Sequence, residues 1–309
     1  MEVLRSLFLA GSQSPWLRNR VTKYSFVRQA VSRFMPGETV DDALRAALAL
    51  RDLSVGSVFT CLGENIKNPE EATGVTSHYL GVLDRIRELG LDAELSVKLT
   101  QLGLDFDRNR CQENLNRIIC HSGSGRFVWI DMESSPYVEP TLDLYRRARC
   151  AFPNVGVCLQ AYLKRTAGDV ESLLPLGPAI RLVKGAYREP SSVAFQHKRD
   201  VDENYFRLAT TLLERQGQNG GARIAIATHD RRLIRRIIDH AISKGIPKNA
   251  FEFQMLYGIQ REEQYRLARE GWKSFALISY GSYWFPWYMR RLAERPANAW
   301  FVVRSIFSG

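Results

Sequence analysis

Residues 126–160, RFVWIDMESSPYVEPTLDLYRRARCAFPNVGVCLQ, contain one complete unit of the fold that this sequence predicts. The unit begins with a short β-rich run at Arg126–Asp131, continues into a segment of helical periodicity at Leu142–Cys150, and ends in an apolar run at Val155–Gln160. A strand, a helix and a second strand in this order are typical of two parallel strands joined by a crossover helix. The stretch therefore predicts an α/β protein with a parallel sheet.

The same alternation repeats along the chain on both sides of this unit. Further strands are predicted at Ser57–Leu62, Ala93–Leu99, Ile180–Lys184, Ile224–Ala227, Phe251–Met255 and Ser274–Ser279. Further helices are predicted at Val75–Leu89, Arg108–Cys120, Asp202–Arg215, Arg231–Lys244 and Glu262–Glu270. Eight such strands in a chain of 309 residues favour closure into a TIM-like (βα)8 barrel over an open sheet.

The N-terminal part of the chain has a different pattern. Residues 22–52 predict two helices, and the second of them, at Asp41–Leu50, has acidic residues in its first turn. No linker rich in Gly, Ser or Pro follows. We therefore expect a single domain with an N-terminal helical addition at residues 1–52 and the barrel at residues 53–309, including a C-terminal helix over the barrel mouth.

Composition excludes a disordered chain, since 45% of the residues are hydrophobic and 25% are charged. The net charge of +10 leaves two interpretations open, plain solubility or attraction to an acidic surface. The densest basic run, Arg231–Arg236, has the spacing of one solvated helix face. The basic residues lack the interleaved aromatic residues of a nucleic-acid platform, so we expect no nucleic-acid partner.

The five cysteines form no CxxC pair and the five histidines form no HxxxH pair. This pattern predicts reduced, mostly buried thiols in a cytoplasmic protein and no metal site. No stretch approaches the about 18 apolar residues of a membrane span. Any contact with a membrane is therefore expected to be peripheral, at the inner face of the cell membrane.

Polar residues stand where the predicted strands end, which is where barrel enzymes place their chemistry. Taken singly, Lys98 could extend from a strand end, Asp131 could cap the next helix, and His229 could be structural. The small residues Gly185 and Ala186 would leave room for a planar ligand to approach the backbone. Convergence on one rim favours a binding site made of Lys98, Asp131, Gln160, Lys184, Thr228, His229, Gln254 and Tyr280.

A second group of polar residues lies near the C-terminus. Trp287, Arg290, Arg291 and Glu294 fall on one helical face at i, i+3, i+4 and i+7. The chain has four adjacent arginine pairs, so a solvated face is an alternative for this one.

Seven motifs in this order resemble the proline dehydrogenase family, and in particular its small single-function bacterial type. They are SVKL (96–99), IDMES (130–134), LQAYL (159–163), RLVKGAY (181–187), ATHD (227–230), FEFQML (251–256) and YG…RRLAERP (280–296). The resemblance implies the first step of proline catabolism, in which L-proline is oxidised to Δ1-pyrroline-5-carboxylate by hydride transfer from C5 to N5 of FAD. It also implies membrane quinone as the electron acceptor and pyrroline-5-carboxylate dehydrogenase as a downstream partner.

The resemblance further implies roles for individual residues. Catalytic roles fall to Lys98, Asp131, Tyr187 and Arg181, with Arg181 near flavin N5 and with Lys98 and Asp131 forming an ion pair beside the substrate carboxylate. The FAD would be lined by Gln160, Arg181, Val183, Lys184, Gly185, Ala186, Thr228, His229, Gln254 and Glu294. The substrate would be bound by Arg290 and Arg291 at its carboxylate, and by Tyr280, Leu256 and Lys98. Guanidinium groups suit the first of these tasks, because they bind a carboxylate bidentately and stay charged.

The sequence departs from the family pattern at Trp287, where the family commonly has tyrosine. Either Trp287 replaces the ring contact, or Tyr288 serves instead, which leaves selectivity toward hydroxyproline open. A different chemistry on the same fold is also open, namely a Schiff-base lyase or aldolase that uses Lys98 or Lys184 as nucleophile.

Overall fold

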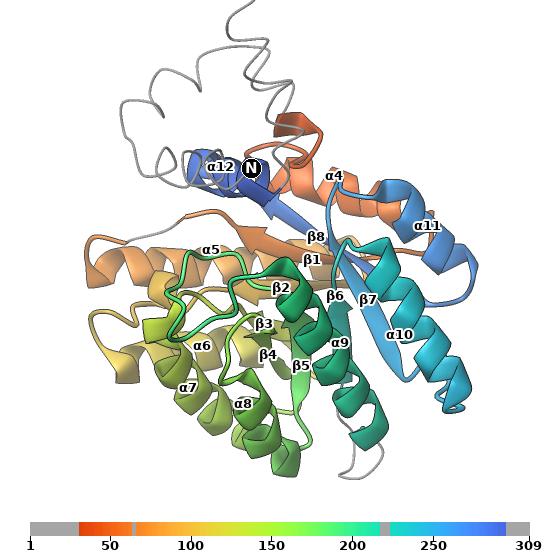
Figure 1. Ribbon diagram of the computed structural model, residues 1–309. Coiled ribbons are helices and arrows are strands. Elements are labelled where there is room, and N and C mark those ends of the chain that lie inside the picture. The colour runs from red at the N-terminus through yellow and green to blue at the C-terminus, as the bar shows by residue number, and fades with distance from the viewer. Residues whose placement is uncertain (1–30, 64–65, 217–222, 295–309) are drawn as a thin grey trace, which may run out of the picture.

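The structure, a computed structural model, describes residues 31–63, 66–216 and 223–294, with only the backbone given for residues 290–294. All eight predicted strands form, and each pairs in parallel with the next. Pairing of β1 with β8 closes the barrel (Figure 1). The strands are β1 (Gly56–Cys61), β2 (Ala93–Val97), β3 (Val128–Ile130), β4 (Val155–Gln160), β5 (Ala179–Val183), β6 (Arg223–Ala227), β7 (Phe251–Leu256) and β8 (Lys273–Tyr280).

Helices follow the strands and form the outer layer of the barrel (Figure 1). They are α4 (Val40–Arg51), α5 (Pro69–Glu88), α6 (Arg108–Ser122), α7 (Val138–Ala151), α8 (Thr166–Leu173), α9 (Lys198–Arg215), α10 (Arg231–Ser243), α11 (Arg261–Arg269) and α12 (Trp284–Glu294). Short 3-10 turns lie at Thr100–Leu102, Ser135–Tyr137 and Leu174–Leu176. The six predicted crossover helices are confirmed, whereas α8 was not predicted, because its eight residues give too short a periodic pattern.

Side-chain caps fix where several helices begin. Thr39 and Asp42 form a capping box at the start of α4, in which each side chain bonds the backbone N–H of the other. Asn68 caps α5, and Pro69 begins the helix six residues before the predicted start at Val75. Asp230 caps α10 by accepting a hydrogen bond from the backbone N–H of Arg232.

Helix α4 packs against β1 and β8, at the seam where the barrel closes. The side chains of Ala43, Leu44, Ala47 and Leu50 are buried there. The chain leaves β8 and enters α12 after only three residues, on the side of the barrel where the strands end. Helix α4 therefore supplies outer cover beside β8 and β1. The other predicted N-terminal helix lies almost entirely outside the described residues.

The interior of the barrel is unusually polar. Contacts between strands that are not neighbours in the sheet run through this interior, as in the ion pairs of Arg181 with Asp131 and of Arg223 with Glu94. Between the two arginines lies Trp129, which is fully buried. Gly156 makes room for its indole ring, since a Cβ atom there would come within 2.5 Å of the ring. Charged residues thus fill space that branched aliphatic residues usually occupy in such barrels.

Two further expectations concern membranes and thiols. Among the described helices, none is both long and apolar enough to cross a bilayer. All five cysteines are free, but the expectation that most are buried is wrong. Cys111 and Cys158 are buried, whereas Cys120 and Cys150 are exposed near the ends of the outer helices α6 and α7.

Candidate active site

Asp131 joins three strands at the end of the barrel where the strands terminate. Its carboxylate accepts hydrogen bonds from Ser96 Oγ at 2.6 Å, Arg181 Nη1 at 3.1 Å and Lys98 Nζ at 3.4 Å. The interpretation of Asp131 as a helix cap is therefore wrong, because its oxygens bind side chains across the mouth. Lys98 is 9% exposed and does not extend into solvent. The predicted Lys98–Asp131 ion pair is present.

Arg181 contacts the protein through its Nη1 and through one face of its guanidinium group. Its Nη1 donates to Ser96 Oγ at 2.8 Å as well as to Asp131, and its Cζ lies 4.7 Å from the ring centre of Trp129. The residue is only 4% exposed, and its Nε and Nη2 have no hydrogen-bond partner among the described residues. Buried donors without a partner are costly, so these N–H groups suit a bound ligand.

Gln160 and Gln254 present acceptors in the same way. Nε2 of Gln160 donates to Met132 O at 3.3 Å, and Nε2 of Gln254 donates to Glu252 Oε1 at 2.7 Å. Each residue is 3% exposed, and its Oε1 has no hydrogen-bond partner within the described ranges. Together with Arg181, these side chains leave both donors and acceptors for a polar ligand.

Lys184 belongs to a group of four charges beyond the end of β5. Its ammonium donates to Asp202 Oδ1 at 2.6 Å and to Asp230 Oδ2 at 2.9 Å, and Lys198 contacts the same two carboxylates. Burial alone would raise the pKa of Asp230, but the hydrogen bond and charge of Lys184, helped by Lys198, lower it to about 2.

Gly185 is needed for the packing of Tyr162. Its φ is +115°, and a Cβ atom at this position would lie 2.2 Å from the ring of Tyr162. The glycine therefore lets Tyr162 pack against the backbone on the side where a Cβ atom would lie. The approach of a planar ligand to this residue stays a prediction.

Thr228 and His229 tie neighbouring loops of the rim together. Thr228 Oγ1 accepts a hydrogen bond from the backbone N–H of Asp230 at 3.2 Å. His229 Nε2 accepts from the backbone N–H of Leu256 at 2.8 Å, so the proton of its neutral ring is on Nδ1. His229 thereby fixes the end of β7, which favours the structural interpretation of this residue while placing it on the rim.

Tyr280 ends β8 and is 1% exposed. Its hydroxyl lies 2.9 Å from Nε2 of His78, which comes from α5 and is 202 residues away in sequence. Burial raises the pKa of Tyr280 well above its ordinary value and lowers that of His78, so both groups are neutral at pH 7. The thiol of Cys61 lies in the same neighbourhood, and burial raises its pKa although the charge of Lys98 opposes this. Neither His78 nor Cys61 carries a signal in the sequence alone.

The remaining predicted contacts on the barrel strands and the loop after β5 are half-buried: Val183, Ala186, Tyr187 and Leu256. The structure thus brings the predicted residues of seven strand ends to one rim.

Comparison with protein families identifies this arrangement. The family model for proline dehydrogenase matches residues 43–304. This chain belongs to the proline dehydrogenase family.

Known proline dehydrogenases match the chain over nearly its whole length. It is 37% identical over 305 residues to proline dehydrogenase 1 of Bacillus subtilis subsp. natto, covering 98% of this chain and 99% of that protein. It is 38% identical over 283 residues to the proline dehydrogenase of Deinococcus radiodurans, covering 90% of each. The chain is accordingly an oxidoreductase that acts in the first step of proline catabolism.

Solved structures show the same fold. Proline utilization A of Bdellovibrio bacteriovorus, inactivated by N-propargylglycine, superimposes with a TM-score of 0.78 at 23% identity. The match covers 94% of this chain and 36% of that one. Proline utilization A of Corynebacterium freiburgense gives a TM-score of 0.73 at 19% identity, over 96% and 34%. This proline dehydrogenase chain therefore spans about a third of the length of those proteins.

The departure from the proline dehydrogenase pattern lies on α12. Tyr288 is 2% exposed, and its ring packs against Phe34 at 6.2 Å and Trp284 at 6.3 Å between ring centres. Burial raises the pKa of Tyr288 to about 12. Tyr288 is thus engaged with Phe34 of the N-terminal segment, which favours Trp287 as the residue that takes the place of the family tyrosine. The side chains of Arg290, Arg291 and Glu294 lie outside the described part of the structure.

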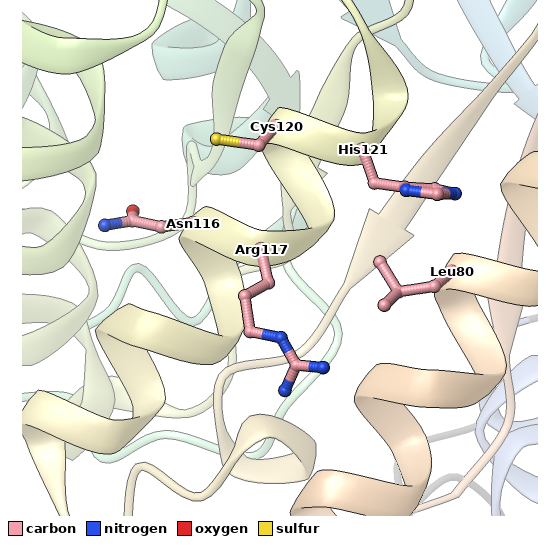
Figure 2. A pocket seen from close by; sticks show the side chains of 5 residues that line it. All are labelled: Leu80, Asn116, Arg117, Cys120 and His121. Carbon is pink, nitrogen blue, oxygen red and sulfur yellow. The ribbon is translucent and has the colours of Figure 1, made fainter.

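A shallow depression of about 510 Å³ lies elsewhere, between α5 and α6 on the outer wall (Figure 2). It is lined by Leu80, Asn116, Arg117, Cys120 and His121. None of the residues that the sequence predicted for the site lines it, and it does not reach the barrel mouth.

Proposed function

We propose that this proline dehydrogenase binds FAD at the mouth of the barrel and oxidises L-proline to Δ1-pyrroline-5-carboxylate there. The observation that carries the proposal is a set of four buried atoms without partners among the described residues. They are Oε1 of Gln160 and of Gln254, and Nε and Nη2 of Arg181. Leaving one such group unpaired costs about 1–3 kcal/mol. A ligand that carries both donors and acceptors, as the flavin ring does, would remove this cost.

The residues present fit such a cofactor. Gln160, Arg181 and Gln254 would meet its polar edge, and we assign further contacts to Val183, Lys184, Gly185, Ala186, Thr228, His229 and Glu294 by resemblance to the family. When bound, FAD would supply the acceptor for the hydride that leaves proline C5. The guanidinium of Arg181 is a permanent positive charge, so it would favour an electron-rich ligand beside it.

Substrate binding is assigned to residues at the ends of β7 and β8 and to helix α12. Arg290 and Arg291 would bind the proline carboxylate as two guanidinium forks. Tyr280 and Leu256 would enclose the ring, with Tyr187 close by. Lys98 stands beside them with its charge balanced by Asp131 at 3.4 Å. Holding the carboxylate at one end and the ring at the other fixes which carbon faces the cofactor, and such orientation accounts for a large part of catalysis.

Asp131 organises this site without touching solvent-exposed groups. It holds Lys98 and Arg181 in fixed positions through one carboxylate, so two cations can stand in a largely buried mouth. A buried cation without a partner would be strongly unfavourable. The pair of cations is therefore preorganised before any ligand binds.

We further propose that electrons pass to membrane quinone, that the enzyme is cytoplasmic with peripheral contact to the membrane, and that pyrroline-5-carboxylate dehydrogenase takes the product. The net charge of +10 supports contact with an anionic surface. These assignments rest on resemblance to the family.

The alternative of a Schiff-base lyase is disfavoured by the partners of both lysines. The ammonium of Lys98 donates to Asp131, and that of Lys184 donates to Asp202 and Asp230. A Schiff-base nucleophile needs a free amine instead. Family membership points the same way.

Absorbance spectroscopy tests the proposal directly. The purified protein should show a flavin spectrum or acquire one from added FAD, and L-proline should bleach it under anaerobic conditions. A protein that takes up no FAD contradicts the cofactor assignment, and a flavin that proline does not bleach contradicts the substrate assignment.

Arg290→Met or Arg291→Met should raise KM for proline steeply while FAD stays bound. An unchanged KM would place the carboxylate elsewhere.

A further inference from the structure

A buried ionic cluster lies below the mouth, inside the amino-terminal half of the barrel. It consists of Glu94 on β2, Arg223 on β6 and Glu252 on β7. Arg223 Nη1 donates to Glu94 Oε1 at 2.6 Å, and Arg223 grips both oxygens of Glu252 at 2.8–3.0 Å. Glu94 is 5% exposed and Glu252 is 3% exposed. The three residues, called the base cluster below, have no assigned part in the reaction.

The base cluster is connected upward to the site by two contacts. Glu252 Oε1 accepts a hydrogen bond from Gln254 Nε2 at 2.7 Å, one layer higher on the same strand. Glu94 Oε2 accepts from the indole of Trp129 at 2.7 Å, and this ring lies under the guanidinium of Arg181. The cluster therefore touches side chains that we assign to FAD.

The contact with Glu252 determines which way the amide of Gln254 points. Because the guanidinium of Arg223 donates to both oxygens of Glu252, both oxygens act as hydrogen-bond acceptors. The group of Gln254 that faces Glu252 must be its NH2, and its carbonyl oxygen must face away.

That carbonyl oxygen has no hydrogen-bond partner among the described residues, in a side chain that is only 3% exposed. If the base cluster only stabilised the barrel, an unpaired carbonyl oxygen at position 254 would not be needed. Leucine or methionine at position 254 would fill the same space without burying an unpaired acceptor. The arrangement is therefore costly unless a ligand donates to the oxygen.

We propose that Glu252 is a positioning residue that fixes the amide of Gln254, so that Oε1 is presented as an acceptor to an N–H group of the flavin ring. The inference rests on the proposed function, since it takes FAD as the ligand. Arg223 keeps Glu252 in the acceptor-only state, and Gln254 carries that constraint to the cofactor.

A double-mutant cycle between Glu252→Gln and Gln254→Met tests this coupling. In Glu252→Gln, the new amide can accept from Arg223 and donate to Gln254, so Gln254 would turn its NH2 toward the ligand. We expect FAD to bind the apoprotein about fivefold more weakly, since a correctly oriented hydrogen bond is worth about 1 kcal/mol. Gln254→Met should weaken binding by a similar factor. In the Gln254→Met background, Glu252→Gln should cause no further loss.

Glu94→Gln is the matched control. It removes a carboxylate charge from the same cluster but has no hydrogen bond to Gln254, so its effect on FAD affinity should be the same in both backgrounds. Thermal unfolding of each apoprotein shows whether the variants fold. Titration of flavin fluorescence gives the affinities, and the midpoint potential of bound FAD provides a second readout that should show the same pattern. If Glu252→Gln weakens FAD binding equally with and without Gln254, the inference is overturned.

A further variant, Gln254→Glu, tests the inference without changing the base cluster. In Gln254→Glu, the new side chain is expected to be protonated beside the carboxylate of Glu252, and it can donate to Glu252 while still presenting a carbonyl oxygen. FAD affinity should then be closer to wild type than in Gln254→Met, and equal losses in both variants would count against the inference. Failure of wild-type protein to take up FAD would instead defeat the proposed function.

Discussion

Asp131 is the residue on which the two cations of the barrel mouth depend. In Asp131→Ala, Lys98 and Arg181 lose the carboxylate that both contact. We expect kcat/KM for proline to fall about 100-fold, because the groups that orient the ligand would be displaced by about 1 Å. The free energy of unfolding should also fall by about 3 kcal/mol, since a buried charge loses its partner.

Steady-state kinetics and urea unfolding measure these two effects separately. Ser96→Ala is the control, because it removes the hydroxyl that donates to Asp131 at 2.6 Å and accepts from Arg181 at 2.8 Å, and it leaves the charges in place. It should cost about 2 kcal/mol, about 1 kcal/mol for each hydrogen bond. Wild-type kinetics in Asp131→Ala would show that the cations need no common carboxylate.

His78 provides a second prediction at the scale of one contact. In His78→Phe, the hydroxyl of Tyr280 loses its partner at 2.9 Å. Loss of one neutral hydrogen bond is worth about 1 kcal/mol, so KM for proline should rise about fivefold with FAD affinity unchanged. In a Tyr280→Phe background, which already lacks the hydroxyl, His78→Phe should raise KM for proline no further. A KM that stays at the wild-type value would separate His78 from the substrate pocket.

Family resemblance predicted the ion pair of Lys98 with Asp131, whereas the contacts of Asp131 with Arg181 and Ser96 were not predicted. Lys98 and Asp131 are 33 residues apart and Arg181 and Asp131 are 50 apart, so only the closed barrel brings them together. One signal does exist in β2. Glu94, Ser96 and Lys98 alternate along a buried strand, and this period of two puts three polar side chains inside the barrel.

At the scale of whole elements, strands were predicted more reliably than helices. Each strand is a mostly buried run of three to eight residues that the sequence marks clearly. Helix α8 lacks such a mark, because only Thr166, Asp169, Val170 and Leu173 are buried and the helix ends after eight residues. The start of α5 depends on the cap at Asn68, which lies outside the periodic stretch from which its start was predicted.

Helix α10 begins at a carboxylate whose ionisation contributes to stability. The pKa of Asp230 falls from its ordinary value of 3.8 to about 2 in the folded protein. Because the folded-state pKa is the lower one, this contribution is present above about pH 4 and is lost as the pH falls toward 2. It amounts to about 2 kcal/mol.

Asp230→Asn should therefore be less stable than wild type at pH 7 and should lose less stability between pH 4 and pH 2. Asparagine still caps a helix, so α10 should remain. Denaturant unfolding at a series of pH values gives the comparison. Asp239→Asn, on the exposed face of the same helix, controls for the loss of one negative charge. Parallel pH curves for wild type and Asp230→Asn would contradict the assignment.

The whole molecule depends on closing one sheet, and the seam between β8 and β1 is where the first and last strands meet. Helix α4 covers that seam with Leu44 and Leu50, which are 2% and 4% exposed. We proposed from the sequence that residues 1–52 are an addition to the barrel. The packing of α4 implies that this helix nevertheless contributes to the stability of the barrel itself.

Leu44→Ala tests that implication. A buried leucine replaced by alanine costs about 2–5 kcal/mol. If α4 and the barrel unfold together, the variant should show a single urea transition at a lower midpoint, with tryptophan fluorescence and circular dichroism changing in step. Leu48→Ala is the matched control on the same helix, because Leu48 is only partly buried and should cost less. An early transition confined to helical signal, with the barrel midpoint unchanged, would instead mean that α4 detaches while the closed sheet survives without it.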